Sequence, residues 1–139
     1  MSKNLEALDE LLREIVRNRT GPLKDPLQDR GLSSLGDIYL NFVYSLAISL
    51  REGNLSSLRI SNKVLADAMK KSGFRSLLPH RLSKNDIGNS AEAMLIYAIV
   101  KGLTSTSKLL QVLTESLNPT EAFTEEFRKI RSLWSYTRR

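Results

Sequence analysis

The chain has 139 residues, of which 41% are hydrophobic and 26% charged, a composition typical of one globular domain that excludes general disorder. It contains no cysteine, which excludes disulfides and thiolate metal sites and favours a reducing compartment. With a net charge of +6, no signal peptide at the N-terminus and an apolar run at residues 38–50 too short for a bilayer span, we expect a soluble cytoplasmic protein without membrane association.

The positive charge is concentrated in one part of the chain. Residues 59–84 contain seven basic residues and one acid, a net charge of +6, whereas residues 1–58 carry −1 and residues 85–139 carry +1. A basic stretch between nearly neutral flanks is typical of a phosphate-binding face. A solvated helix face explains the charge equally well, so charge alone leaves both interpretations open.

The first predicted helix covers residues 3–18, where apolar side chains recur every three or four residues. Thr20-Gly21-Pro22 ends it, and residues 22–32 read as a loop.

The second predicted helix starts at Ser34, with Asp37 as its capping-box partner, and ends near Glu52 before Gly53. Its middle, residues 38–50, is apolar on every side, so we expect this helix to be the buried centre of the domain.

Four more helices are predicted in the rest of the chain, and no strand is. The last one carries a stripe of large apolar residues that we expect in the core or at a dimer contact: Phe123, Phe127, Ile130 and Trp134. The four helices cover residues 61–73, 83–100, 105–117 and 118 onward, with a proline and an acid marking the start of the last.

Acidic residues are the best candidates for chemistry. The glycines form no phosphate-binding loop, and a single histidine without cysteine leaves little for a nucleophilic triad. Asp37 and Glu92 each precede a run of apolar residues within a helix. Asp37 could simply cap, but Glu92 is too deep in its helix to do so, and Asn89 shares its face three residues earlier.

Three segments around these residues resemble motifs of the ribonuclease III family, in the family's order and at about its spacing. They are Leu35-Gly36-Asp37-Ile38-Tyr39-Leu40, Ile60-Ser61-Asn62-Lys63-Val64-Leu65-Ala66 and Gly88-Asn89-Ser90-Ala91-Glu92-Ala93-Met94-Leu95. The resemblance covers about residues 30–100 and is greatest to short, stand-alone archaeal members.

The resemblance implies a fold and a function. The fold would be an all-α, ribonuclease III-like bundle of about six to seven helices, with residues 1–139 as a single domain and no appended double-stranded-RNA-binding domain. In the family this nuclease domain forms a homodimer whose two metal-dependent sites lie along a valley that receives double-stranded RNA.

The chain departs from the family in its carboxylates. Of the four catalytic carboxylates, two positions are matched by Asp37 and Glu92, whereas the other two fall on Ser33 and Asn89. A fifth acid, which opens the family's first motif, would fall near Arg30.

If the protein cleaves RNA, the resemblance implies that Asp37 and Glu92 hold a Mg²⁺ or Mn²⁺ ion, with Asn89 as a third catalytic residue. Asp86 lies one turn before Asn89 and is a possible further ligand, although a capping arrangement with Ser83 is the more ordinary interpretation.

Three hypotheses follow. The first is an RNA-binding relative with weakened or lost cleavage, for which a ribonucleoprotein is a candidate partner. The second is an active Mg²⁺-dependent endoribonuclease. The third is a helical interaction module without nucleic acid. In the first hypothesis, the RNA contacts would come from the basic stretch, with these residues as candidates: Lys63, Lys70, Lys71, Arg75 and Arg81.

Overall fold

The computed structural model describes residues 2–135 of the chain. They form six α-helices and two short 3-10 helices joined by loops. No strand occurs within these residues, so the all-helical prediction is confirmed. In chain order the elements are α1 (Ser2–Arg17), η1 (Pro26–Gln28), α2 (Arg30–Glu52), α3 (Asn62–Ser72), η2 (Phe74–Leu77), α4 (Lys84–Val100), α5 (Thr106–Glu115) and α6 (Pro119–Leu133).

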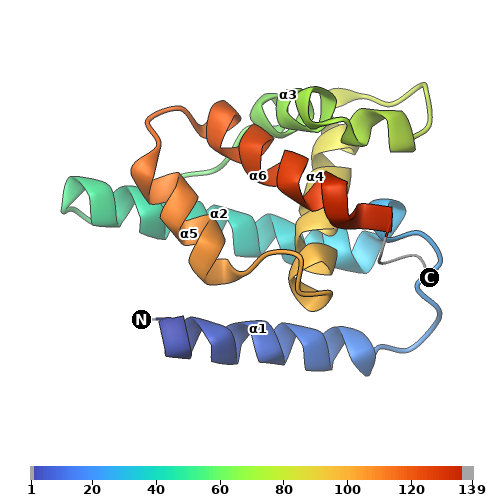
Figure 1. The fold of residues 1–139 in the computed structure, drawn as a ribbon, viewed down its shortest axis with the longest axis horizontal. Coiled ribbons are helices and arrows are strands. Elements are labelled where there is room, and N and C mark those ends of the chain that lie inside the picture. Colours follow the sequence, from blue (N-terminus) through green and yellow to red (C-terminus); the bar gives the residue numbers. More distant parts are fainter. Residues whose placement is uncertain (1, 136–139) are drawn as a thin grey trace.

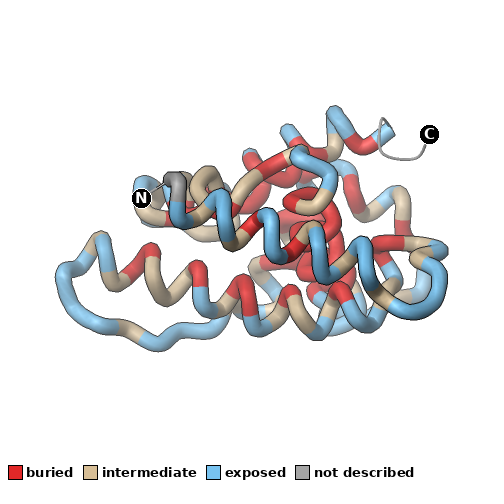
Figure 2. The backbone as a smooth tube through the Cα atoms, turned by 90° about the horizontal axis from the view of Figure 1, so that it is seen from below, coloured by how far each residue is buried: buried red, intermediate tan, exposed pale blue. Residues whose placement is uncertain are grey.

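Helix α4 is the centre of the domain. All residues from Ser90 to Ile99 are buried, and the helix packs against α1, α2, α3 and η1 (Figure 1). Figure 2 shows the buried residues gathered in the middle of the molecule, with exposed residues along the outer sides of the surrounding helices. A helix that is apolar on every side is stable only in such a position.

The prediction that α2 is the buried central helix is therefore wrong. One face of α2 packs on α4 and α5, but Ile38 and Phe42 on its other face are 72% and 59% exposed. The apolar run in this helix thus supplies both a core face and an exposed apolar face. The pattern of apolar residues alone does not distinguish these two uses.

The predicted start of α2 is also wrong. The helix begins at Arg30, because Asp29 is its N-cap and accepts a hydrogen bond of 2.8 Å from the N–H of Leu32. Arg19 donates two hydrogen bonds to the same carboxylate, at 2.8 and 3.0 Å. These bonds hold the pKa of the Asp29 carboxyl group below its usual range. Ser34 consequently lies inside the helix and does not form a capping box with Asp37.

The other predicted helix starts are confirmed. Ser61, Ser83 and Asn118 are the N-caps of α3, α4 and α6, and Ser83 forms a full capping box with Asp86. The apolar stripe of the last helix lies in the core: Phe123, Phe127, Ile130 and Trp134 are all nearly inaccessible. None of the helices within residues 2–135 is long and apolar enough to cross a membrane.

The crossing of α2 and α4 depends on one glycine. A Cβ atom on Gly36 would lie 2.4 Å from the carbonyl oxygen of Glu92 and 2.7 Å from its carbonyl carbon, closer than packed atoms tolerate. Only glycine therefore lets the two helix backbones meet here. This contact brings Asp37, the next residue of α2, beside Glu92 of α4.

We expect Gly36→Ala to destabilise the fold by about 1–3 kcal/mol, because the helices must separate to admit the methyl group. The higher helix propensity of alanine, about 1 kcal/mol, offsets only part of this loss. Urea denaturation followed by circular dichroism measures it. Gly88→Ala is the comparison: its Cβ would meet the movable side chain of Asn62, so its loss should be smaller. A Gly36→Ala variant as stable as the wild type would contradict the close crossing.

Candidate functional site

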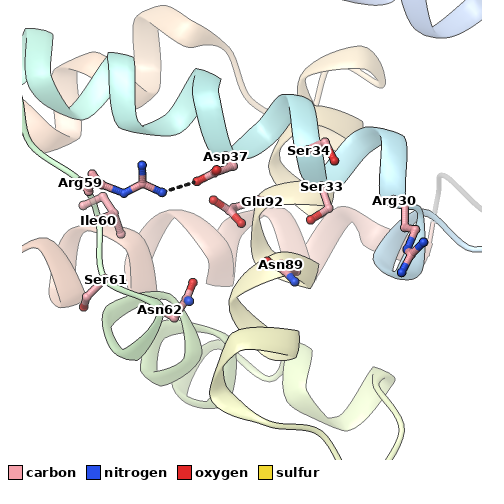
Figure 3. Close-up of a pocket in the computed structure, with 10 residues that line it drawn as sticks. All are labelled: Arg30, Ser33, Ser34, Asp37, Arg59, Ile60, Ser61, Asn62, Asn89 and Glu92. Atoms are coloured by element: carbon pink, nitrogen blue, oxygen red, sulfur yellow. Dashed lines mark hydrogen bonds and ion pairs between the residues drawn. The ribbon is translucent and has the colours of Figure 1, made fainter.

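An open pocket of about 740 Å³ lies between α2, α4 and the segment that leads into α3 (Figure 3). It contains the residues that the three sequence motifs had singled out, together with two arginines. The lining residues are Arg30, Ser33, Ser34, Asp37, Arg59, Ile60, Ser61, Asn62, Asn89 and Glu92.

Asp37 lies in the third turn of α2 and keeps 43% of its side chain exposed. Its Oδ1 accepts a hydrogen bond of 3.0 Å from the Asn41 amide, one turn further along the helix. The same oxygen is 3.5 Å from an Nη2 atom of Arg59, an ion pair drawn in Figure 3. Asp37 therefore has two partners within the protein itself.

Glu92 lies deeper, on the central helix, with 5% of the residue exposed. Burial is the largest of three effects that together raise the pKa of its carboxyl group to about 8. The other two are a hydrogen bond with Asp37 and the negative charge of Asp37. The positive charge of Arg59 opposes this shift. At neutral pH the Glu92 carboxyl group therefore favours its protonated, uncharged form.

The three residues predicted as catalytic, Asp37, Asn89 and Glu92, all line the same pocket. Asn89 is exposed at the pocket edge one turn before Glu92, and Ser33 lies one turn before Asp37 on α2. Asp86 does not line this pocket: its carboxylate accepts a hydrogen bond from the N–H of Ser83 in the capping box.

Sequence reasoning did not assign Arg59 or Asn41 to the site. Arg59 had been counted only as part of the basic stretch, yet it reaches the carboxylate of Asp37. Asn41 joins both sides of the pocket, since its amide donates to Asp37 and its Oδ1 accepts from the N–H of Ile60 at 2.8 Å. The four-residue spacing from Asp37 to Asn41, which places both on one helix face, was the signal available.

The donor set does not fit the divalent-ion site of an active nuclease of the predicted kind. Two carboxylates are present in the pocket; one is paired with Arg59 and the other favours its protonated form. Within the described residues, no group of three or more His, Asp or Glu side chains could hold a metal ion. Arg59 places positive charge beside Asp37, where a cation would have to bind.

The predicted RNA-contacting residues differ in their environment. Lys63, Lys70, Lys71 and Arg81 are exposed. Arg75 is half-buried, and its guanidinium donates to the carbonyl oxygens of Pro79 and His80 at 2.8 and 2.6 Å. Arg75 thus holds the turn before α4, and its free donors are fewer than those of the lysines.

The raised pKa of Glu92 predicts a pH-dependent stability. Its carboxyl group has an ordinary pKa of 4.5 in the unfolded chain and about 8 in the folded protein, so ionisation is disfavoured by folding. The free energy of unfolding should therefore decrease as the pH rises from 4.5 towards 8, and Glu92→Gln should remove this decrease. Urea denaturation between pH 5 and 8 measures it, with Glu125→Gln on the exposed side of α6 as the control. A constant difference between Glu92→Gln and wild type across this range would contradict the raised pKa.

The comparisons with known proteins identify the family. The family model described as Ribonuclease III matches residues 30–134, which include α2 to α6 and every residue of the pocket, and leave α1 outside. None of the curated proteins compared with the chain matches it. The match covers well over half of the sequence and agrees with the all-helical fold. The chain therefore belongs to the ribonuclease III family.

Proposed function

We propose that this protein binds structured or double-stranded RNA as a homodimer and has weakened or lost metal-dependent cleavage. Family membership connects the chain with double-stranded RNA. The observation that carries the proposal is the composition of the pocket, where two carboxylates stand beside two arginines.

The pocket charges argue against tight binding of a divalent ion. Arg30 and Arg59 balance the formal charges of Asp37 and Glu92, so the pocket has no net negative charge to attract a cation. A metal ion at Asp37 would also have to compete with Arg59 for the same carboxylate oxygen. Ser33 and Asn89 add neutral oxygen atoms but no charge.

The exposed basic residues supply a surface for phosphates. Lys63 and Lys70 are separated by two turns of α3 and so lie on the same side of it, and Lys71 and Arg81 are exposed nearby in the chain. Double-stranded RNA is recognised mainly by its shape and through backbone contacts, which such a surface can make.

The exposed apolar face of α2 supports a homodimer. Ile38 and Phe42 lie one turn apart, and Leu55 and Leu58 extend the apolar surface into the segment after α2. Contiguous exposed apolar side chains mark interaction surfaces. Ile38 directly follows Asp37, so a partner docked on this face would lie beside the pocket.

In a cleavage assay with end-labelled double-stranded RNA and Mg²⁺ or Mn²⁺, we expect retarded RNA without products, even at high protein excess. The Glu92→Gln variant should bind the RNA too, because binding in this proposal uses phosphate contacts. Affinity should fall steeply with salt, because those contacts release counterions. Discrete products made by the wild type and not by Glu92→Gln would instead establish the alternative, an active Mg²⁺-dependent endoribonuclease.

Charge reversal locates the binding face. Lys70→Glu with Lys71→Glu should weaken RNA binding by at least about tenfold. Lys24→Glu with Lys129→Glu, an equal charge change at exposed positions outside the basic stretch, should have a smaller effect. Equal effects of the two double variants would remove the assignment of this face, and absence of any RNA binding would favour an interaction module without nucleic acid.

We expect Phe42→Glu to convert a dimer into a monomer of 15.7 kDa in sedimentation velocity at micromolar concentration, because it places a charge in the apolar contact. Leu117→Glu is the matched control, since Leu117 is 86% exposed in the α5–α6 connection and outside this face. A monomeric wild type at this concentration would contradict the homodimer.

A further inference from the structure

The segment that carries Arg59 is fastened to α2 by three polar side chains. They recur every four residues along α2, so they form one row on its surface. Each bonds to the backbone of the segment, with donor–acceptor distances of 2.8 Å for the three backbone N–H groups. The bonds join Ser49 to Ser56, Ser45 to both the N–H and the carbonyl of Leu58, and Asn41 to Ile60. The backbone on both sides of Arg59 is therefore held in place.

The Arg59 side chain itself remains open to ligands. It is 78% exposed, and a single Nη2 atom contacts Asp37 at 3.5 Å. A guanidinium group has five N–H donors, so most of them are available towards the pocket. Figure 3 shows Arg59 and Arg30 on opposite sides of the carboxylate pair. Seven residues of helix separate Arg30 from Asp37, about 10 Å along α2.

We propose that this pocket binds a backbone phosphate of RNA directly through the guanidinium of Arg59, with no metal ion between the carboxylates and the phosphate. The inference rests on the proposed RNA binding and assigns its central contact. A planar guanidinium can donate two parallel hydrogen bonds to a phosphate. The contact of 3.5 Å with Asp37 holds the guanidinium at the pocket, and the ordered backbone on both sides of Arg59 reduces the entropy that is lost when the phosphate binds.

The rest of the pocket suits an anion held by neutral donors. Hydroxyl and amide groups line the pocket, and O–H and N–H groups of these kinds can donate hydrogen bonds to phosphate oxygens. They belong to Ser33, Ser34, Ser61, Asn62 and Asn89. The Asn62 amide already donates one hydrogen bond to Asn85 and keeps its second N–H. Of the two carboxylates that would repel a phosphate, Asp37 is paired with Arg59, and Glu92 is almost completely buried.

The test measures binding of a short, fluorescently labelled RNA duplex by anisotropy, in EDTA and in Mg²⁺. We expect the wild type to bind the RNA as tightly in EDTA as in Mg²⁺. Arg59→Ala should reduce the affinity about tenfold. Arg59→Lys should reduce it less, because lysine keeps the charge but not the paired donors. Arg17→Ala, an exposed arginine of α1 outside the pocket, is the charge-matched control and should lose no more than about twofold. Circular dichroism verifies that each variant is folded.

Glu92→Gln gives different results for the two modes of binding. If Arg59 holds the phosphate directly, the variant should bind RNA in EDTA at neutral pH as tightly as the wild type, because the buried Glu92 carboxyl group already favours its uncharged form. If a metal ion bridges the carboxylates and the phosphate, the same variant should weaken binding in Mg²⁺. Binding that needs Mg²⁺ and is weakened by Glu92→Gln would overturn the inference.

The remaining outcomes separate the inference from the proposed function. If Arg59→Ala and Arg17→Ala weaken RNA binding equally, the role of Arg59 is overturned and the proposed RNA binding stands. Absence of RNA binding overturns the proposed function, and titration of inorganic phosphate then tests the pocket alone. A saturable shift of the Arg59 Nε–H signal in NMR would keep the phosphate site, whereas no shift would remove it.

Discussion

The close crossing of α2 and α4 at Gly36 is the constraint on which the site depends. Gly36 lets the α2 backbone meet the carbonyl of Glu92, and the next residue, Asp37, is thereby fixed beside that glutamate. Since α4 is buried from Ser90 to Ile99, Glu92 is carried into the protein interior with it. The raised pKa of Glu92 is thus a consequence of how the helices pack. A larger residue at position 36 would separate the two acids as well as the two helices.

Because this packing buries Glu92, the number of carboxylates in the pocket affects their ionisation more strongly than it would at an exposed surface. A buried acid is ionised only when enough positive charge stands near it. In the pocket that charge comes from an arginine bonded to Asp37, which already satisfies part of the demand that a metal ion would otherwise meet. With Glu92 in its uncharged form, the negative charge of Asp37 is the one that Arg59 faces.

Much of the fold followed from the sequence because the relevant signals are local. Serine and asparagine caps marked the starts of α3, α4 and α6, and four-residue spacing marked the apolar stripe of α6. The start of α2 was missed although its N-cap, Asp29, is a local signal, because Ser34 and Asp37 have the spacing of a competing capping box. The exposure of Ile38 and Phe42 was missed because an apolar run reads alike in a core and at an interface. Asp37, Asn89 and Glu92 were found from their positions beside apolar helical runs and from the family motifs, whereas Arg59 enters the site only through the folding of its segment against α2.

The presence of Asp37 is not by itself an argument for cleavage. Its carboxylate accepts a hydrogen bond from Asn41, and Asn41 in turn holds the backbone at Ile60, next to Arg59. Asp37 therefore has a structural use in ordering the segment before α3, whatever chemistry the pocket performs. Glu92 interacts with that segment through the charge of Arg59 and helps to hold none of its backbone. Replacement of Glu92 by glutamine therefore reports on the chemistry of the pocket more directly than changes at Asp37 do.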